Sequence, residues 1–174
     1  MAFIILIFFL MTTTMNVDSG IQRQLPPIPE DKVEMEINQR NVLLVFVSAS
    51  NDIMVGGERM EVSQIKDKVK EFVVNPNENP NLSDFEMTEI DNLGNYPVSL
   101  GVVSLQNDRG TNYGVYIQVQ NELTRAFQEI RDEVSMRYYG RPFGPDLSDE
   151  NRKAITLAVP QKISEAEPRN IGGQ

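Results

Sequence analysis

The chain has 174 residues and a formal net charge of −9, from 16 basic and 25 acidic residues. Nucleic-acid binders need a basic face to neutralise phosphates, so this balance argues against nucleic acid as a partner. Cysteine and histidine are both absent, which excludes disulfides, thiol nucleophiles, Cys/His zinc sites and Ser–His catalytic pairs. No calcium-loop motif is present either, so we expect no metal, no cofactor and no enzymatic activity.

The N-terminus predicts a membrane segment. Residues 1–11 are all apolar, and the first charge is Asp18. A helix from Met1 to Met15 reaches only roughly 22 Å, whereas the hydrocarbon core is about 30 Å thick. No Lys or Arg precedes the run and no small-residue cleavage site follows it, which disfavours a signal peptide. A buried core helix remains an alternative. We expect residues 1–17 to form a partial transmembrane helix whose first turns precede Met1.

Residues 18–40 predict an extended linker, because proline fixes φ and removes amide donors. Leu25, Pro26 and Pro27 are the candidate partner-binding residues, as an element that pairs with a strand of a partner or of a second protomer. The alternative is a stiff spacer that holds the domain away from the bilayer. Residues 12–14 are all threonine; they either line a polar pore or bond to carbonyls of their own helix.

The folded domain is expected over residues 41–165. The apolar run 42–47 predicts a strand buried on both faces, and 53–55 a returning strand. Apolar residues at helical spacing from Val62 to Phe72 predict a helix that stops before Pro76. Residues 75–97 are rich in Asn and Pro and predict a surface insertion with one short edge strand at 85–90.

The second half predicts a strand at 98–105 and then a long helix. Its apolar residues recur at steps of three and four, and Gly140 and Pro142 end it. They are Tyr116, Val119, Leu123, Phe127, Ile130 and Val134. A short helix at 148–159 and an edge strand near 162–164 precede a flexible tail at 166–174. The fold class is therefore α+β, with a mixed sheet packed on two main helices.

Three polar or aromatic groups have competing interpretations. Asp108 and Arg109 resemble an acid/base pair, but a turn capped by Asp is the simpler interpretation. Tyr113 and Tyr116 either anchor the long helix on the sheet or contact a partner. The Asn-rich residues 75–81 are either plain loop or a partner surface.

The order of membrane segment, Leu-Pro linker, two strands, helix, strand and long helix resembles the ExbD/TolR family of biopolymer transport proteins. The most telling match runs from Asp108 through Tyr113 into the long helix, a turn after a strand followed by a Tyr that opens the helix. Gln24-Leu25-Pro26 resembles the family's Leu-Pro element. The similarity covers nearly the whole chain, apart from the insertion and the stretch after Tyr139. Within the family, the chain looks closest to an ExbD-like branch with long periplasmic insertions.

This resemblance implies a single-pass protein of the bacterial inner membrane with its C-terminal domain in the periplasm. It implies a homodimer inside an ExbB- or TolQ-like ring of polytopic membrane subunits, surrounded by membrane lipid. Proton flow through the ring would drive motion that passes to a TonB- or TolA-like transducer and energises transport across the outer membrane. The alternative is a TolR-like role in envelope maintenance, or a peptidoglycan-associated periplasmic anchor.

The family's chemistry is reversible protonation of one Asp near the cytoplasmic start of the membrane helix, since a charged carboxylate in lipid is costly. By the resemblance, that Asp would fall just before Met1. Asp18 lies on the far side of the apolar run and cannot replace it. We therefore assign no proton-carrying or catalytic residue within these 174 positions, and we expect that the sequence either starts at an internal Met or comes from a truncated gene.

Overall fold

A computed structural model describes residues 39–166 of the chain. The predicted membrane helix, the linker with Leu25, Pro26 and Pro27, and the tail lie outside the described residues. Within 39–166, no helix combines the length and the apolar character needed to cross a bilayer. The described part is an α+β domain, as predicted, with a short 3-10 turn η1 (Gln39–Asn41) at its start.

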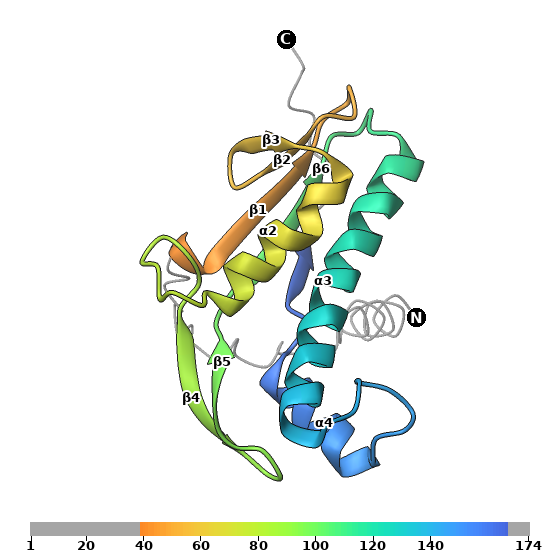
Figure 1. Ribbon diagram of the computed structural model, residues 1–174. Coiled ribbons are helices and arrows are strands. Elements are labelled where there is room, and N and C mark those ends of the chain that lie inside the picture. Colours follow the sequence, from red (N-terminus) through yellow and green to blue (C-terminus); the bar gives the residue numbers. More distant parts are fainter. Residues whose placement is uncertain (1–38, 167–174) are drawn as a thin grey trace, which may run out of the picture. The chain divides into compact units, whose positions relative to one another are not determined.

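The main sheet has five strands in the order β3-β2-β1-β6-β7, and it is mixed (Figure 1). Central β1 (Val42–Val47) pairs antiparallel with β2 (Ile53–Val55) and parallel with β6 (Val102–Asn107). The edges are β3 (Glu58–Met60), antiparallel to β2, and β7 (Ile163–Glu165), parallel to β6. The strands predicted at 42–47, 53–55 and near 162–164 are confirmed.

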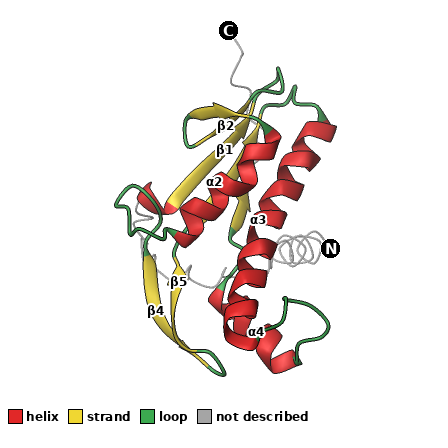
Figure 2. Ribbon diagram, viewed as in Figure 1, coloured by secondary structure: helices red, strands yellow, loops and turns green. Residues whose placement is uncertain are grey.

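The sheet buries one face only. In β1 the side chains of Leu43, Val45 and Val47 are buried, whereas Leu44 between them is 42% exposed. The prediction that this strand is buried on both faces is therefore wrong. The helices lie over a single face of the sheet (Figure 2), so the alternate side chains of β1 meet no second layer within the described residues.

The two main helices predicted, α2 (Val62–Val74) and α3 (Tyr113–Tyr139), lie over that face (Figure 2), and the short helix predicted at 148–159 is also present, as α4 (Asp149–Ala158). Helix α2 packs beside α3, and α4 follows near the end of α3. The periodic residues of α3 are buried as predicted, from Val119 to Val134. Capping residues define three of the helix ends. The side chains of Asn112 and Ser148 accept backbone N–H groups at the N-termini of α3 and α4, and the Gly140 N–H donates to the Met136 carbonyl at the C-terminus of α3.

The predicted insertion is a β-hairpin rather than a loop with one edge strand. Strand β4 (Phe85–Ile90) has the predicted bounds, but it pairs with β5 (Gly94–Ser99) in a separate two-stranded sheet. The single strand predicted at 98–105 is wrong, because Leu100 and Gly101 interrupt it and only its second part joins the main sheet as β6. The hairpin contacts α4, so these two parts of the chain lie together at one end of the domain (Figure 1).

Candidate partner-binding site

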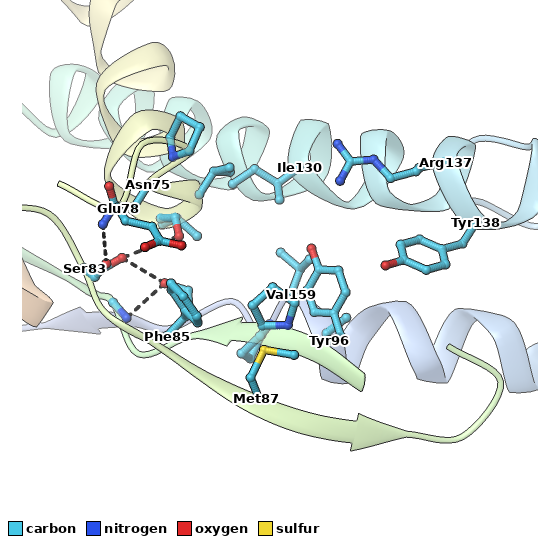
Figure 3. A pocket seen from close by; sticks show the side chains of 18 residues that line it. Asn75, Glu78, Ser83, Phe85, Met87, Tyr96, Ile130, Arg137, Tyr138 and Val159 are labelled. Carbon is cyan, nitrogen blue, oxygen red and sulfur yellow. Dashed lines mark hydrogen bonds between the residues drawn. The ribbon is translucent and has the colours of Figure 1, made fainter. Parts of the chain in front are cut away.

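A cavity of about 580 Å³ opens between the hairpin, the C-terminal half of α3 and the end of α4. We call it the hairpin pocket (Figure 3). Its apolar lining includes Phe85 and Met87 of β4, Tyr96 and Pro97 of β5, and Tyr138 of α3. These positions come from the hairpin and from α3, which are far apart in sequence, and the fold brings them together.

A network of buried polar side chains fixes the base of the pocket. Asn75 ends α2 in the left-handed conformation (φ 40°), and its amide Nδ2 donates to the Ser83 carbonyl at 2.9 Å. The buried Ser83 hydroxyl donates to the Phe72 carbonyl at 2.6 Å and lies 3.0 Å from the Ser99 hydroxyl. These bonds attach the start of β4 and the end of β5 to the C-terminal end of α2.

The wall and rim of the pocket are aromatic and partly exposed. Phe85 is 37% exposed, Met87 59% and Tyr138 43%. The rings of Tyr96 and Tyr138 meet edge to face with centroids 6.1 Å apart, which joins β5 to α3. Burial, and then the neighbouring Tyr138, raises the pKa of the Tyr96 hydroxyl, so this ring is neutral across the physiological range.

The charged groups of the pocket do not form a catalytic arrangement. Glu78 and Arg137 lie towards opposite ends of the pocket (Figure 3). The Ser83 hydroxyl is occupied by backbone and hydroxyl partners, and among residues 39–166 no carboxylate is hydrogen-bonded to it. Within residues 39–166, no cluster of three or more acidic side chains is arranged to hold a metal ion. Apolar side chains around an open cavity suit the binding of an apolar anchor rather than chemistry.

The second candidate region is the turn from β6 into α3, which the sequence motif singled out. Asp108 donates its backbone N–H to the Val47 carbonyl at 2.9 Å, and the Thr111 hydroxyl lies 3.0 Å from the same oxygen. Arg109 is exposed, and the described residues contain no ion pair that involves Asp108 or Arg109. The turn interpretation is therefore favoured over an acid/base pair.

The two tyrosines that follow this turn have different environments. Tyr113 is 76% exposed and covers no core, so its predicted role as a helix anchor is wrong. Tyr116 is half-buried against the core, and its hydroxyl accepts a hydrogen bond from Gln120 at 3.3 Å. Burial and the nearby Glu165 carboxylate raise the pKa of the Tyr116 hydroxyl. Tyr116 thus anchors α3, and Tyr113 is free to contact solvent or a partner.

The candidate residues Leu25, Pro26 and Pro27, and Thr12 to Thr14, lie outside the described residues, so their roles stay predictions. The pocket residues were not predicted as a site. The signal for them was the alternation of apolar Phe85 and Met87 with polar residues inside the insertion.

The sequence was next compared with known families. The model of the family described as biopolymer transport protein ExbD/TolR matches residues 1–131. The chain belongs to the ExbD/TolR family. This confirms the resemblance seen in the order of elements and in the turn from Asp108 to Tyr113. It also assigns the chain an accessory role in biopolymer transport.

The ExbD/TolR match ends within α3, eight residues before the end of that helix at Tyr139. The hairpin lies inside the matched range, whereas Arg137, Tyr138 and α4 lie beyond it. The hairpin pocket therefore combines elements from both sides of this limit. A search of curated proteins found no match to the chain.

Proposed function

We propose that this ExbD/TolR protein is the accessory subunit of a motor in the bacterial inner membrane that is driven by the proton-motive force. In this proposal it acts as a homodimer with an ExbB-like ring and passes motion to a TonB-like transducer, which energises transport across the outer membrane. It catalyses no covalent chemistry. The single observation that carries the proposal is the family match, which begins at Met1 and includes the apolar run.

The absence of buried carboxylates among residues 39–166 supports a role for the described domain other than proton transfer. Among residues 39–166 the buried polar side chains are Asn75, Ser83 and Ser135, and none of these is a carboxylate. A proton carrier needs a carboxyl group whose desolvation changes with its protonation state. We therefore propose that the described domain transmits force and binds partners, and that it does not itself carry protons.

Uptake by cells tests this function. A strain without the gene is compared with one that carries it, and the uptake of a labelled iron chelate across the outer membrane is measured with and without a proton ionophore. We expect the gene to restore ionophore-sensitive uptake. Unchanged uptake combined with new sensitivity to detergents would contradict the proposal and identify a TolR-like role in envelope maintenance.

A further inference from the structure

The hairpin has two outer strand edges that no other strand covers in the described part of the chain, and of these β5 contains a proline, Pro97, whereas β4 does not. Strand β4 pairs only with β5, and it forms the outer margin of the domain on that side (Figure 1). Five of its six residues are exposed, Phe85 through Glu89, and none of the six is proline. An edge of this length leaves backbone N–H and C=O groups available to an added strand.

The same strand presents apolar side chains beside the pocket. Phe85 and Met87 both line the hairpin pocket and are exposed by more than a third. Val74, 45% exposed at the end of α2, extends this surface across the cavity. An added strand on β4 would thus place its own side chains next to a pocket that accepts an apolar group.

The hairpin and the segment before it carry charge of one sign, whereas Arg137 of α3 lies towards the other end of the pocket from Glu78 (Figure 3). Residues 75–99 contain five acidic side chains and no basic one: Glu78, Asp84, Glu86, Glu89 and Asp91. Within residues 39–166, Asp84 pairs with Arg40 at 3.7 Å, while the other four take part in no ion pair. By contrast, Glu129 on α3 is neutralised by Lys66 at 2.8 Å and Lys70 at 3.2 Å. The uncompensated charge selects a basic occupant.

We propose that the β4 edge and the hairpin pocket bind an extended, basic segment of a partner protein as an added strand, with one apolar side chain in the pocket. The identity of that partner as the motor's transducer rests on the proposed function. A second copy of this chain is a poor occupant, because pairing β4 with β4 brings Glu86 and Glu89 of two copies together. An anionic polymer is disfavoured by the same four carboxylates.

A peptide-binding measurement tests the site in the full-length protein, held in detergent micelles. The probe is a fluorescent decapeptide of alternating lysine and valine with one central phenylalanine, and binding is followed by fluorescence polarisation. Its matched control alternates glutamate and valine. We expect the lysine peptide to bind at least tenfold more tightly, and methylation of alternate backbone nitrogens to weaken it at least tenfold, since that removes the strand's donors. Equal binding of all three peptides would overturn the proposal.

Two pairs of substitutions locate the binding. Glu86→Gln with Glu89→Gln removes two charges from β4, and we expect it to weaken the lysine peptide at least fivefold. Asp67→Asn with Glu71→Gln removes the same charge from exposed positions of α2, and we expect a change below twofold. Equal losses of peptide affinity in the two double variants would show that binding depends only on net charge, and this result would overturn the proposed site.

A third variant tests the competing occupants. The chain has no cysteine, so Thr88→Cys places a single thiol on β4. A disulfide-linked homodimer in oxidised membranes, or displacement of the lysine peptide by peptidoglycan fragments, would overturn the proposal.

If the peptide fails to bind while the chain still co-purifies with a ring partner, the site is wrong and the proposed function stands. If the peptide binds but no ring partner co-purifies with the chain, the site is supported and the proposed motor function is wrong.

Discussion

At the scale of single residues, Asn75 carries more of the hairpin's support than its place in an Asn-rich segment suggests. Its backbone is left-handed, it is 4% exposed, and its side chain makes three hydrogen bonds, to Asn79 and Ser83. Asn75→Ala loses these bonds and strains the backbone, which we expect to lower the free energy of unfolding by about 2–4 kcal/mol. Urea unfolding of the full-length chain, followed by circular dichroism, measures this.

Asn75→Gly serves as the backbone control, because glycine adopts the left-handed conformation freely. We expect about half the loss seen for alanine. Asn77→Ala, an exposed neighbour, should change the free energy of unfolding by less than about 0.5 kcal/mol. Equal effects at positions 75 and 77 would show that the hydrogen-bond network is unimportant.

Gly101 is required by close packing rather than by backbone conformation. A Cβ atom there would lie 2.8 Å from the Phe72 ring and 2.9 Å from Cβ of Ser83, and both neighbours are buried. We expect Gly101→Ala to destabilise the domain by about 1–3 kcal/mol. Gly144→Ala is the matched control, since a Cβ there meets nothing within 4 Å. Comparable unfolding midpoints for the two variants would contradict this packing argument.

These residues explain why the site was hard to predict. Asn and Pro at 75–81 are typical of turns, and Asn75 does end a helix, but nothing in the sequence indicates that its amide reaches Ser83. The pocket residues Phe85, Tyr96 and Tyr138 have no common period, because they come from different elements. The turn at Asp108 was predictable because all its bonds are local or reach the adjacent end of β1.

At the scale of elements, ion pairs between α2 and α3 make the packing of these helices depend on pH. Hydrogen bonds from Lys66, and then Lys70, lower the pKa of the Glu129 carboxyl. Because the Glu129 pKa is lower in the folded than in the unfolded state, its ionised carboxylate stabilises the fold. This stabilisation is complete above the unfolded pKa, near 4.5, and is lost as the pH falls through the folded-state pKa. The salt bridges are partly exposed, so we expect a modest effect.

Glu129→Gln tests this contribution. We expect the variant to unfold at a lower urea concentration than the wild type at pH 7, and the difference to shrink steadily below pH 4.5. Glu71→Gln, at an exposed position of α2, is the control and should show no such trend. A difference between wild type and Glu129→Gln that stays constant down to pH 3 would contradict the assignment.

Elements were predictable where side-chain burial follows a period. The periodic apolar residues of α3 and the apolar run of β1 predicted the bounds of both elements to within a few residues. Strands β3 and β5 were missed because their residues are polar or include Pro97, which sequence reasoning assigns to loops. The bounds of β4 were predicted, but its partner was not, since pairing depends on a hairpin that forms outside the main sheet.

At the scale of the whole molecule, the family was predictable from the order of elements, and the match to residues 1–131 confirms it. The hairpin and α4 were visible only as a polar insertion and a short helix. Their contact creates the pocket, and such long-range contact is set by packing rather than by local pattern. The hairpin lies inside the range that the family model matches and α4 lies beyond it, so the family match alone does not predict the pocket between them.

Co-purification of the full-length chain from membranes shows whether it works inside a membrane complex. The chain is tagged at its C-terminus, extracted from membranes in mild detergent, and its bound proteins are identified by mass spectrometry. We predict that an ExbB- or TolQ-like polytopic subunit is recovered in amounts comparable to or greater than the tagged chain. Recovery of the chain alone, or its release from broken cells without detergent, would contradict the account.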